Sequence, residues 1–512
     1  MQHTIFMPTF KWTGLFLVTS LLTAPIFTAQ AQTDSQTKAI QVDFKKIPVP
    51  TELSSNCNQQ QCLPPDAKPT YSNCTFHSLR DKTSLFTCSL VWVTQNEPSP
   101  NFYQIYALPF DIQGNALNPV LLPLNKEGET SKFISAMTQD RWVIERTYVD
   151  GRHEFEVINP NAPQKSLQTL NVKTSILMVL DAKNAPWTDG VFILARPPLN
   201  ADDKISVTDR FLIDFEAFDK ANNELQTVWE KEINFVQTFL PKAYEADINL
   251  EIDLHHKYLA IRPEGTPVTY GQEILFDEVK GEQRGSFVLC LSLQNEGAVQ
   301  SSFVLPNVYL RKNMLSVRPD NSVLFISPII NSYDINQPYQ NKGWQLYSME
   351  KNCQENSIKK LTLLQFPFKS NATGEIRVYG LLTTNEKNYI LYSSGPILPN
   401  YCEECSEEVN WQNLVKSMPA LYILETDQNG NMLKNHTVIS PFDANHLFLG
   451  VLPGEHPDLL QYELVFTGNQ KTILIMVHNK ETLTTEYISE DELQYPQPAS
   501  EALMIYRLHL KQ

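Results

Sequence analysis

The amino-acid sequence predicts an all-β protein that repeats one structural unit, and three observations carry this prediction. From Thr70 onward the chain is a succession of short runs rich in β-branched and aromatic residues, a composition typical of strands. Asn, Asp, Gly and Pro separate these runs, and helical patterns are few. One turn motif also returns along the chain, near positions 111, 161, 219, 295, 353 and 427. Intervals of roughly 50 to 80 residues fit a four-stranded unit with long connections.

The turn motif is clearest in three segments that each follow an apolar strand. The segments align without a gap, with aspartate at the first position and Gly or Asn at the fourth: Asp111 with Gly114, Asp219 with Asn222, and Asp427 with Gly430. Gly and Asn are the residues that best tolerate a positive φ. The fourth position therefore predicts a hairpin turn that requires a left-handed residue.

The segment from Asp427 to Asn431 has a second interpretation, because its oxygen-bearing side chains alternate as they do in a calcium loop. A helix-loop-helix calcium site needs a Glu at the twelfth position, where this sequence has Val438. The recurrence of the motif favours backbone geometry, so we expect a turn and no metal site.

The repeat resembles a β-propeller, in which four-stranded antiparallel blades surround a central channel. The resemblance covers residues 70–512 and is to an architecture only, because paired Gly-His and Trp-Asp marks and a kelch double glycine are missing. It implies one propeller with seven blades. Six or eight blades, and a row of separate β-sandwiches, are the alternatives.

The last strand-like run, which begins at Ala502, ends the chain where its turn is due. The last sheet would therefore lack its outer strand. Upstream, residues 32–69 are polar and rich in proline, and predict an extended arm. Within this arm Ile40, Val42 and Phe44 alternate with polar residues. We expect a strand at 40–44 to complete the last sheet and remove an exposed edge.

The N-terminus has the features of a secretory signal peptide over residues 1–31. A short basic region ending at Lys11 precedes an apolar run, and Ala29-Gln30-Ala31 precedes a polar stretch. We expect cleavage before Gln32, a periplasmic or extracellular location, and no integral membrane span after cleavage. An uncleaved anchor is the alternative.

The charge balance excludes two classes of partner. The chain has 41 basic and 57 acidic residues, and loss of the signal peptide removes only one of these, Lys11. Nucleic acids and anionic membranes both attract basic surfaces, so neither is an expected partner.

Eight cysteines in an exported chain favour disulfides. Cys74 and Cys88 flank a predicted hairpin with its turn at Arg80 to Lys82, a register in which they face each other beside Phe76 and Phe86. Proximity along the chain favours two further pairs, and elimination leaves the last one: Cys57 with Cys62, Cys402 with Cys405, and Cys290 with Cys353.

Local motifs identify no catalytic, cofactor-binding or metal-binding residue. The Cys402-Glu-Glu-Cys405 segment resembles a redox motif, but its acidic neighbours disfavour a thiolate. The adjacent His255 and His256 would face opposite sides of a strand. No nucleophile elbow, zinc-protease motif or glycine-rich phosphate loop occurs.

The missing motifs favour a non-enzymatic, exported propeller that presents loops to a protein or carbohydrate partner, without a cofactor. Two alternatives stay open: a propeller hydrolase or lyase with acids from several blades, and a structural component of a cell-surface or secretion assembly. The sequence leaves the oligomeric state open.

Overall fold

The structure is a computed structural model of the chain. The chain divides into two units, residues 1–36 and 37–512, and all described residues belong to the second. The described residues are 40–42, 68–93, 102–122, 125, 129–150, 153–162, 166–170, 176, 178–197, 210–222, 224–239, 257–277, 281–292, 296–329, 343–367, 374–396, 420–439, 460–468, 470–479 and 502–510.

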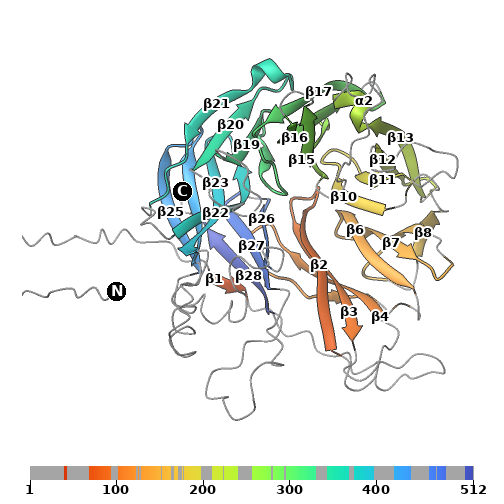
Figure 1. The fold of residues 1–512 in the computed structure, drawn as a ribbon. Coiled ribbons are helices and arrows are strands. Elements are labelled where there is room, and N and C mark those ends of the chain that lie inside the picture. Colours follow the sequence, from red (N-terminus) through yellow and green to blue (C-terminus); the bar gives the residue numbers. More distant parts are fainter. Residues whose placement is uncertain are drawn as a thin grey trace, which may run out of the picture. The chain divides into compact units, whose positions relative to one another are not determined.

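Seven four-stranded antiparallel sheets form a ring, so the prediction of a seven-bladed β-propeller is confirmed (Figure 1). We number the blades in chain order. The first three are blade 1, β2 (Lys68–Ser78), β3 (Ser84–Val93), β4 (Phe102–Phe110) and β5 (Val120–Leu121); blade 2, β6 (Thr130–Thr138), β7 (Arg141–Thr147), β8 (His153–Ile158) and β9 (Ser166–Leu170); and blade 3, β10 (Met178–Asn184), β11 (Gly190–Arg196), β12 (Arg210–Asp219) and β13 (Glu224–Asn234).

The next three blades repeat this order of strands. They are blade 4, β14 (Lys257–Ile261), β15 (Pro267–Asp277), β16 (Gly281–Ser292) and β17 (Ala298–Pro306); blade 5, β18 (Leu315–Val317), β19 (Val323–Pro328), β20 (Trp344–Met349) and β21 (Lys359–Leu363); and blade 6, β22 (Gly374–Thr383), β23 (Lys387–Pro396), β24 (Ala420–Asp427) and β25 (Met432–Ile439). Helical structure in the described part of the chain is limited to α2 (Phe235–Phe239) and the 3₁₀ turn η3 (Glu355–Ser357).

Blade 7 joins the two ends of the second unit. Its strands are β26 (Leu460–Phe466), β27 (Thr472–Asn479), β28 (Ala502–His509) and β1 (Ile40–Val42). β1 pairs antiparallel with β28, with Ile40 opposite Arg507 and Val42 opposite Ile505. The N-terminal strand thus lies at the place where the sequence analysis expected one, with bounds 40–42 in place of 40–44.

A separate apolar core fills each of the seven interfaces between neighbouring blades. In β11, for example, Val191 and Ile193 pack toward blade 2, whereas Phe192 and Leu194 pack toward blade 4. A strand that is buried on both faces needs a continuous apolar run rather than alternation. This explains runs such as Val191–Ala195, and it excludes a row of separate sandwiches, since no sheet has only one packed face.

The antiparallel order gives the ring two unlike ends. Hairpins between the first and second strands, and between the third and fourth strands, lie at one end, which we call the hairpin end. The other connections of each blade leave from the opposite end. The six turn positions that the sequence analysis identified all fall on hairpins between third and fourth strands, in blades 1 to 6.

Two of the repeated turns share one hydrogen-bond pattern. The Oδ1 atom of Asp111 accepts from the backbone N–H of Gln113 at 2.9 Å and Asn115 at 2.8 Å, and Asp427 binds its own turn in the same way. Gly114 and Gly430 have φ of +81° and +91°. Both glycines pack on the preceding blade, where a Cβ on Gly430 would lie 2.4 Å from Thr362 Cγ2.

The third copy of the turn is different. Asn222 is not among the described residues with positive φ. It therefore aligns with Gly114 and Gly430 in sequence but does not share their left-handed backbone conformation. Asp219 pairs with Glu224 across the ladder, and the Nδ2 of Asn222 donates to Asp219 Oδ2 at 2.7 Å. In the other two turns the same hydrogen bond comes from the fifth position, from the amides of Asn115 and Asn431. In the third copy it comes from the fourth position, because this hairpin is one residue shorter.

Two of the four predicted cysteine pairs are disulfides in the structure. Cys74 and Cys88 join β2 to β3 with a Cα–Cα distance of 4.1 Å, beside the ring pair Phe76 and Phe86, whose centroids are 5.3 Å apart. Cys290 and Cys353 join blade 4 to blade 5. The other predicted cysteines, Cys57, Cys62, Cys402 and Cys405, lie outside the described residues, as do the signal peptide, His255 and His256.

Candidate functional site

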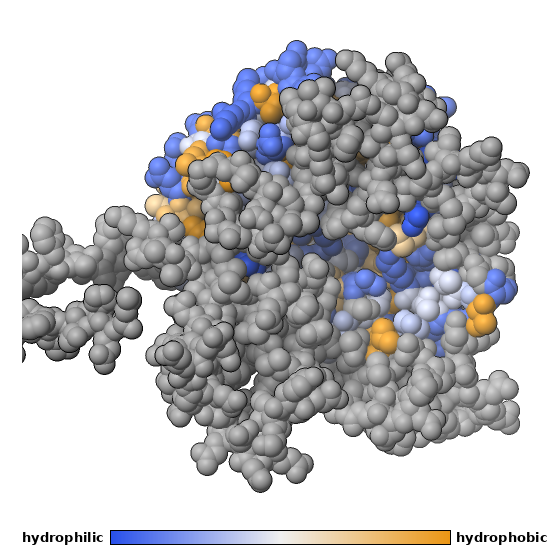
Figure 2. All heavy atoms as spheres, viewed as in Figure 1, coloured by the Kyte–Doolittle hydropathy of each residue, from blue (hydrophilic) through white to orange (hydrophobic). Residues whose placement is uncertain are grey.

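The innermost strand of each blade is the first one, and neighbouring innermost strands contact each other around the axis (Figure 1). Contacts bridge the blades here in a closed series, which we call the axial belt; side chains take part at every interface except that of blades 5 and 6, where the contact is between backbone groups. From the blade 1–2 interface around to blade 7–1, the contacts are His77 with Phe133, Lys132 with Val179 O, Asp181 with Leu259 N, Tyr258 with Lys312, Leu381 N with Asn313 O, Tyr379 with Tyr462, and Glu463 with Phe76 N. Described residues visible toward the middle of Figure 2 are mostly hydrophilic.

Glu463 on β26 is the most heavily engaged carboxylate of the belt. Its Oε2 atom accepts from the hydroxyl of Thr75 and from the backbone N–H of Phe76, both at 2.7 Å. Its Oε1 atom contacts the Nζ of Lys312. Both carboxylate oxygens of Glu463 therefore contact groups from other blades, Thr75 and Phe76 of blade 1 and Lys312 of blade 5.

Asp181 on β10 is the second carboxylate of the belt. Its Oδ2 atom accepts from the backbone N–H of Leu259 at 2.8 Å, which ties blade 3 to blade 4. Its Oδ1 atom lies 3.6 Å from the Nζ of Lys183. The side chain of Asp181 is 13% exposed against 5% for Glu463, so Asp181 is the more accessible of the two.

Lys312, in the segment that leads into β18, lies between these acids. Burial alone would lower its pKa, but the nearby carboxylates of Glu463 and Asp181 hold that pKa above its usual range. Lys312 is therefore a protonated cation at neutral pH. Its side chain is still 39% exposed. We call Asp181, Lys312 and Glu463 the axial cluster.

Two tyrosines and a histidine next to the axial cluster are unsuited to act as bases near neutral pH. Burial raises the pKa of Tyr258 despite the neighbouring Lys312, and burial raises the pKa of Tyr462 well above its ordinary value. Burial, together with Lys183 and Lys312, lowers the pKa of His77 to about 3. None of these three groups is therefore charged near neutral pH.

A second acid–base pair lies in the outer part of blade 6. The Nε2 of His436 is 2.7 Å from Glu425 Oε2, and the Nζ of Lys387 is 2.7 Å from Glu425 Oε1. Burial opposes ionisation of Glu425, but hydrogen bonds from His436 and Lys387 outweigh it and lower its pKa. His436 is 1% exposed, so this contact is buried and a substrate does not reach it.

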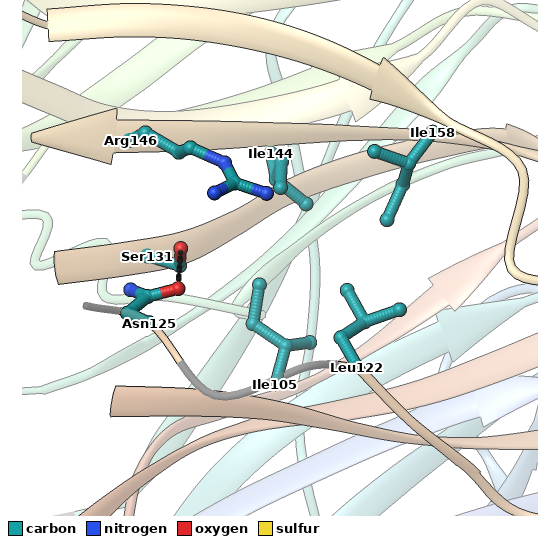
Figure 3. A pocket seen from close by; sticks show the side chains of 7 residues that line it. All are labelled: Ile105, Leu122, Asn125, Ser131, Ile144, Arg146 and Ile158. Atoms are coloured by element: carbon teal, nitrogen blue, oxygen red, sulfur yellow. Dashed lines mark hydrogen bonds between the residues drawn. The ribbon is translucent and has the colours of Figure 1, made fainter. Parts of the chain in front are cut away.

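Figure 3 shows a cavity between blades 1 and 2, with a volume of about 10 Å³. Ile105, Leu122, Ile144 and Ile158 supply most of its wall. At one side Ser131 donates to Asn125 Oδ1 at 2.7 Å. A volume near the size of one water molecule excludes an organic substrate, so this cavity is not the candidate site.

The residues that the sequence analysis singled out lie away from the axial cluster. The turn residues Asp111, Asp219 and Asp427 lie in outer hairpins, and the two disulfides brace blades. Within the described residues no group of three or more His, Cys, Asp or Glu side chains could hold a metal ion. No local sequence motif marks Asp181, Lys312 or Glu463, because these residues come from three different blades.

Comparisons with known proteins identify similar structures but no family. No protein-family model matches the chain, and no curated protein matches it. Among solved structures, polysaccharide lyase Uly1 is 8% identical with a TM-score of 0.39, over 94% of this chain and 98% of that one. The tricorn protease is 8% identical with a TM-score of 0.37, over 81% of this chain and 34% of that one.

A puromycin hydrolase mutant is 7% identical with a TM-score of 0.34, over 80% of this chain. This chain spans 34%, 59% and 55% of the first three matched structures, the third being of prolyl endopeptidases. No helix in the described part of the chain is long and apolar enough to cross a membrane.

The prediction of a non-enzymatic scaffold is wrong. It depended on the absence of local catalytic motifs, yet the matching propeller-like structures are of enzymes: a protease, endopeptidases, a hydrolase and a lyase. A ring of blades places residues from distant parts of the chain at one axis, so an active site of this kind leaves no local motif. At these identities the likeness is one of fold alone.

Proposed function

We propose that the protein is a hydrolase or lyase whose charged groups come from several blades, with the axial cluster as its active site. One observation carries this proposal. Asp181 of blade 3 and Glu463 of blade 7 both interact with Lys312 of blade 5, whose side chain is 39% exposed. Charged groups that converge from separate elements are typical of a catalytic centre.

The three groups differ in what they offer a substrate. Glu463 is held by three partners, so it positions the ammonium group of Lys312. Lys312 stabilises negative charge that develops on a bound carbonyl, phosphoryl or glycosidic oxygen. Asp181 is the general acid–base, because one of its oxygens has only the 3.6 Å contact with Lys183 and the N–H of Ala182. The substrate class is a protein or a carbohydrate.

A matched set of variants tests the proposal. Purified protein is screened against peptide and polysaccharide panels, with new amine or reducing ends scoring hydrolysis and ultraviolet absorbance of unsaturated products scoring elimination. Asp181→Asn and Lys312→Met should each lower kcat/KM at least roughly 100-fold, the lower range for removal of a general acid–base or a preorganised charge.

The control variant is Glu350→Gln, which makes the same kind of change at an exposed ion pair with Lys359. It should retain activity. Full activity of both axial variants on a substrate that the protein cleaves would contradict the assignment, and melting temperatures show whether each variant is folded.

We also propose that the chain is exported after removal of residues 1–31, which leaves the arm of residues 32–69 at the start of the mature protein. The disulfides Cys74–Cys88 and Cys290–Cys353 support an oxidising environment. N-terminal sequencing of protein recovered outside the cytoplasm should begin at Gln32. A sequence that begins at Met1 would overturn this proposal.

A further inference from the structure

A cluster of charged residues at the hairpin end of the ring gathers three cations around one buried carboxylate. Asp189, in the β10–β11 hairpin, has a side chain that is only 5% exposed. Its Oδ1 atom accepts from Arg80 Nη1 at 2.7 Å. Its Oδ2 atom lies 2.8 Å from Arg141 Nη1 and 3.0 Å from Lys220 Nζ. We call these four residues the Asp189 cluster.

The four members come from different hairpins of three blades. Arg80 lies between β2 and β3 in blade 1, and Arg141 begins β7 in blade 2. Asp189 and Lys220 follow β10 and β12 in blade 3. All these hairpins lie at the same end of the ring because the strands are antiparallel. The ring therefore brings together charges that the sequence keeps far apart.

The cluster has more positive charge than its carboxylate can neutralise. Three cations against one carboxylate leave two positive charges, in a chain whose formal net charge is −16. Like charges that are held within one ion-pair distance of the same group repel each other. Fastening blades 1 and 2 to blade 3 needs one cation from each of them, Arg80 and Arg141, so the third cation, Lys220 of blade 3 itself, requires another reason.

The arginines also have donors to spare. A guanidinium carries five N–H donors in a planar fork, and Arg80 and Arg141 each donate one hydrogen bond to Asp189. The other N–H groups of Arg80 have no partner among the described residues. Arg80 is 41% exposed and Lys220 65%, so these donors face solvent and are available to a ligand.

The position of Arg141 is fixed from a second side. Its guanidinium lies over the ring of Phe218, 4.9 Å from the centroid, a favourable cation–π distance. The backbone N–H of Phe218 in turn donates to the carbonyl of Asp189 at 2.7 Å. Preorganisation of this kind reduces the entropy that is lost when a ligand binds.

We propose that Arg80, Arg141 and Lys220 form, around Asp189, a binding site for an oxyanion with two negative charges, such as a phosphate or sulfate group. Planar guanidinium forks match the oxygens of these anions and two cations remain to neutralise them. The site is separate from the axial cluster and does not depend on the proposed enzyme activity.

Titration with inorganic phosphate and with sulfate tests the site. Calorimetry on the whole protein at constant ionic strength, adjusted with sodium chloride, should show saturable binding of one equivalent and a rise in melting temperature. Both anions should bind, because recognition is by charge and geometry. Absence of saturable binding by either anion, at concentrations where chloride has no effect, would overturn the proposal.

Two variants and a control separate a binding site from a simple fastening of blades. Lys220→Met should weaken phosphate binding roughly three- to tenfold, the loss expected for one charge-assisted contact. Lys359→Met is the control, because Lys359 has the same 65% exposure and also forms one ion pair. Equal weakening by the control variant would show only general electrostatics and contradict the site.

Asp189→Asn gives a result of opposite sign. It removes the resident carboxylate, so without phosphate the three cations repel and the melting temperature should fall. Phosphate should then bind more tightly than it binds the unaltered protein and restore stability. A loss of stability that phosphate does not restore would mean that the cluster only fastens the blades.

Discussion

At the scale of the residue, the buried polar groups at the axis of this ring hold neighbouring blades together. Those of the axial belt mostly bridge one innermost strand to the next, as Asp181 does with Leu259 and Glu463 with Phe76. Buried carboxylates without such partners would be costly. The hydrogen bonds that join neighbouring blades therefore also offset the cost of burying the Asp181 and Glu463 side chains at the axis.

His77 links the belt to the pH dependence of stability. It is 8% exposed, its Nε2 lies 3.0 Å from Thr87 Oγ1, and its pKa is about 3 because of burial and the nearby Lys183 and Lys312. In the unfolded chain a histidine has a pKa near 6.5. As pH falls below that value, the unfolded state binds a proton that the folded state refuses.

The free energy of unfolding should therefore fall as pH drops from about 6.5 toward 3, by about 2 kcal/mol between pH 7 and pH 5 from this residue alone. Urea unfolding at both pH values measures the loss. His77→Gln, which keeps a polar partner for Thr87, should lose about 2 kcal/mol less over the same interval. An equal pH dependence in both proteins would mean that His77 is protonated in the fold.

At the scale of the element, β1 is a short edge strand that comes from the opposite end of the chain to the rest of its blade. It has three residues and pairs with β28 alone. Without it, β28 would expose the edge of blade 7, and an exposed edge destabilises and invites pairing with other chains. The strand is short, so its contribution should be measurable without abolishing the fold.

A chain that starts at Lys45 should melt about 2 to 5 °C below a chain that starts at Thr37, for a loss of one to a few kcal/mol in a large domain. Thermal unfolding by circular dichroism measures the difference. A synthetic peptide of residues 37–44 should restore the melting temperature of the shorter chain. Identical melting temperatures without the peptide would show that β1 adds nothing to closure.

Sequence patterns predicted the elements better than they predicted their contacts. Runs such as "TILIMV" gave strands, and the Asp111 and Asp427 turns share one structure because Gly114 and Gly430 satisfy the same backbone requirement. The Asp219 turn differs from the other two although its sequence aligns with theirs. Its hairpin is one residue shorter, and Asn222 caps Asp219 with its side chain instead of supplying a left-handed backbone residue.

At the scale of the whole molecule, periodicity predicted the architecture, including the count of seven blades. The axial cluster was beyond sequence patterns for a physical reason. Asp181 and Glu463 each look like a single acid in an apolar run and Lys312 like one of two adjacent cations, and only closure of the ring brings the three together. The signal was a charge within the first strand of a repeat, as in "YELVF" around Glu463.

The pairing of β1 with β28 also has a consequence for the order in which the molecule is made. β1 leaves the ribosome before every other described strand, and its partner residues, Ile505 to Arg507, lie in β28, the last of the described strands. Blade 7 therefore stays incomplete until β28 has been synthesised, whatever the first six blades have done. Every earlier species presents the unpaired edge of a strand to the chaperones that meet it.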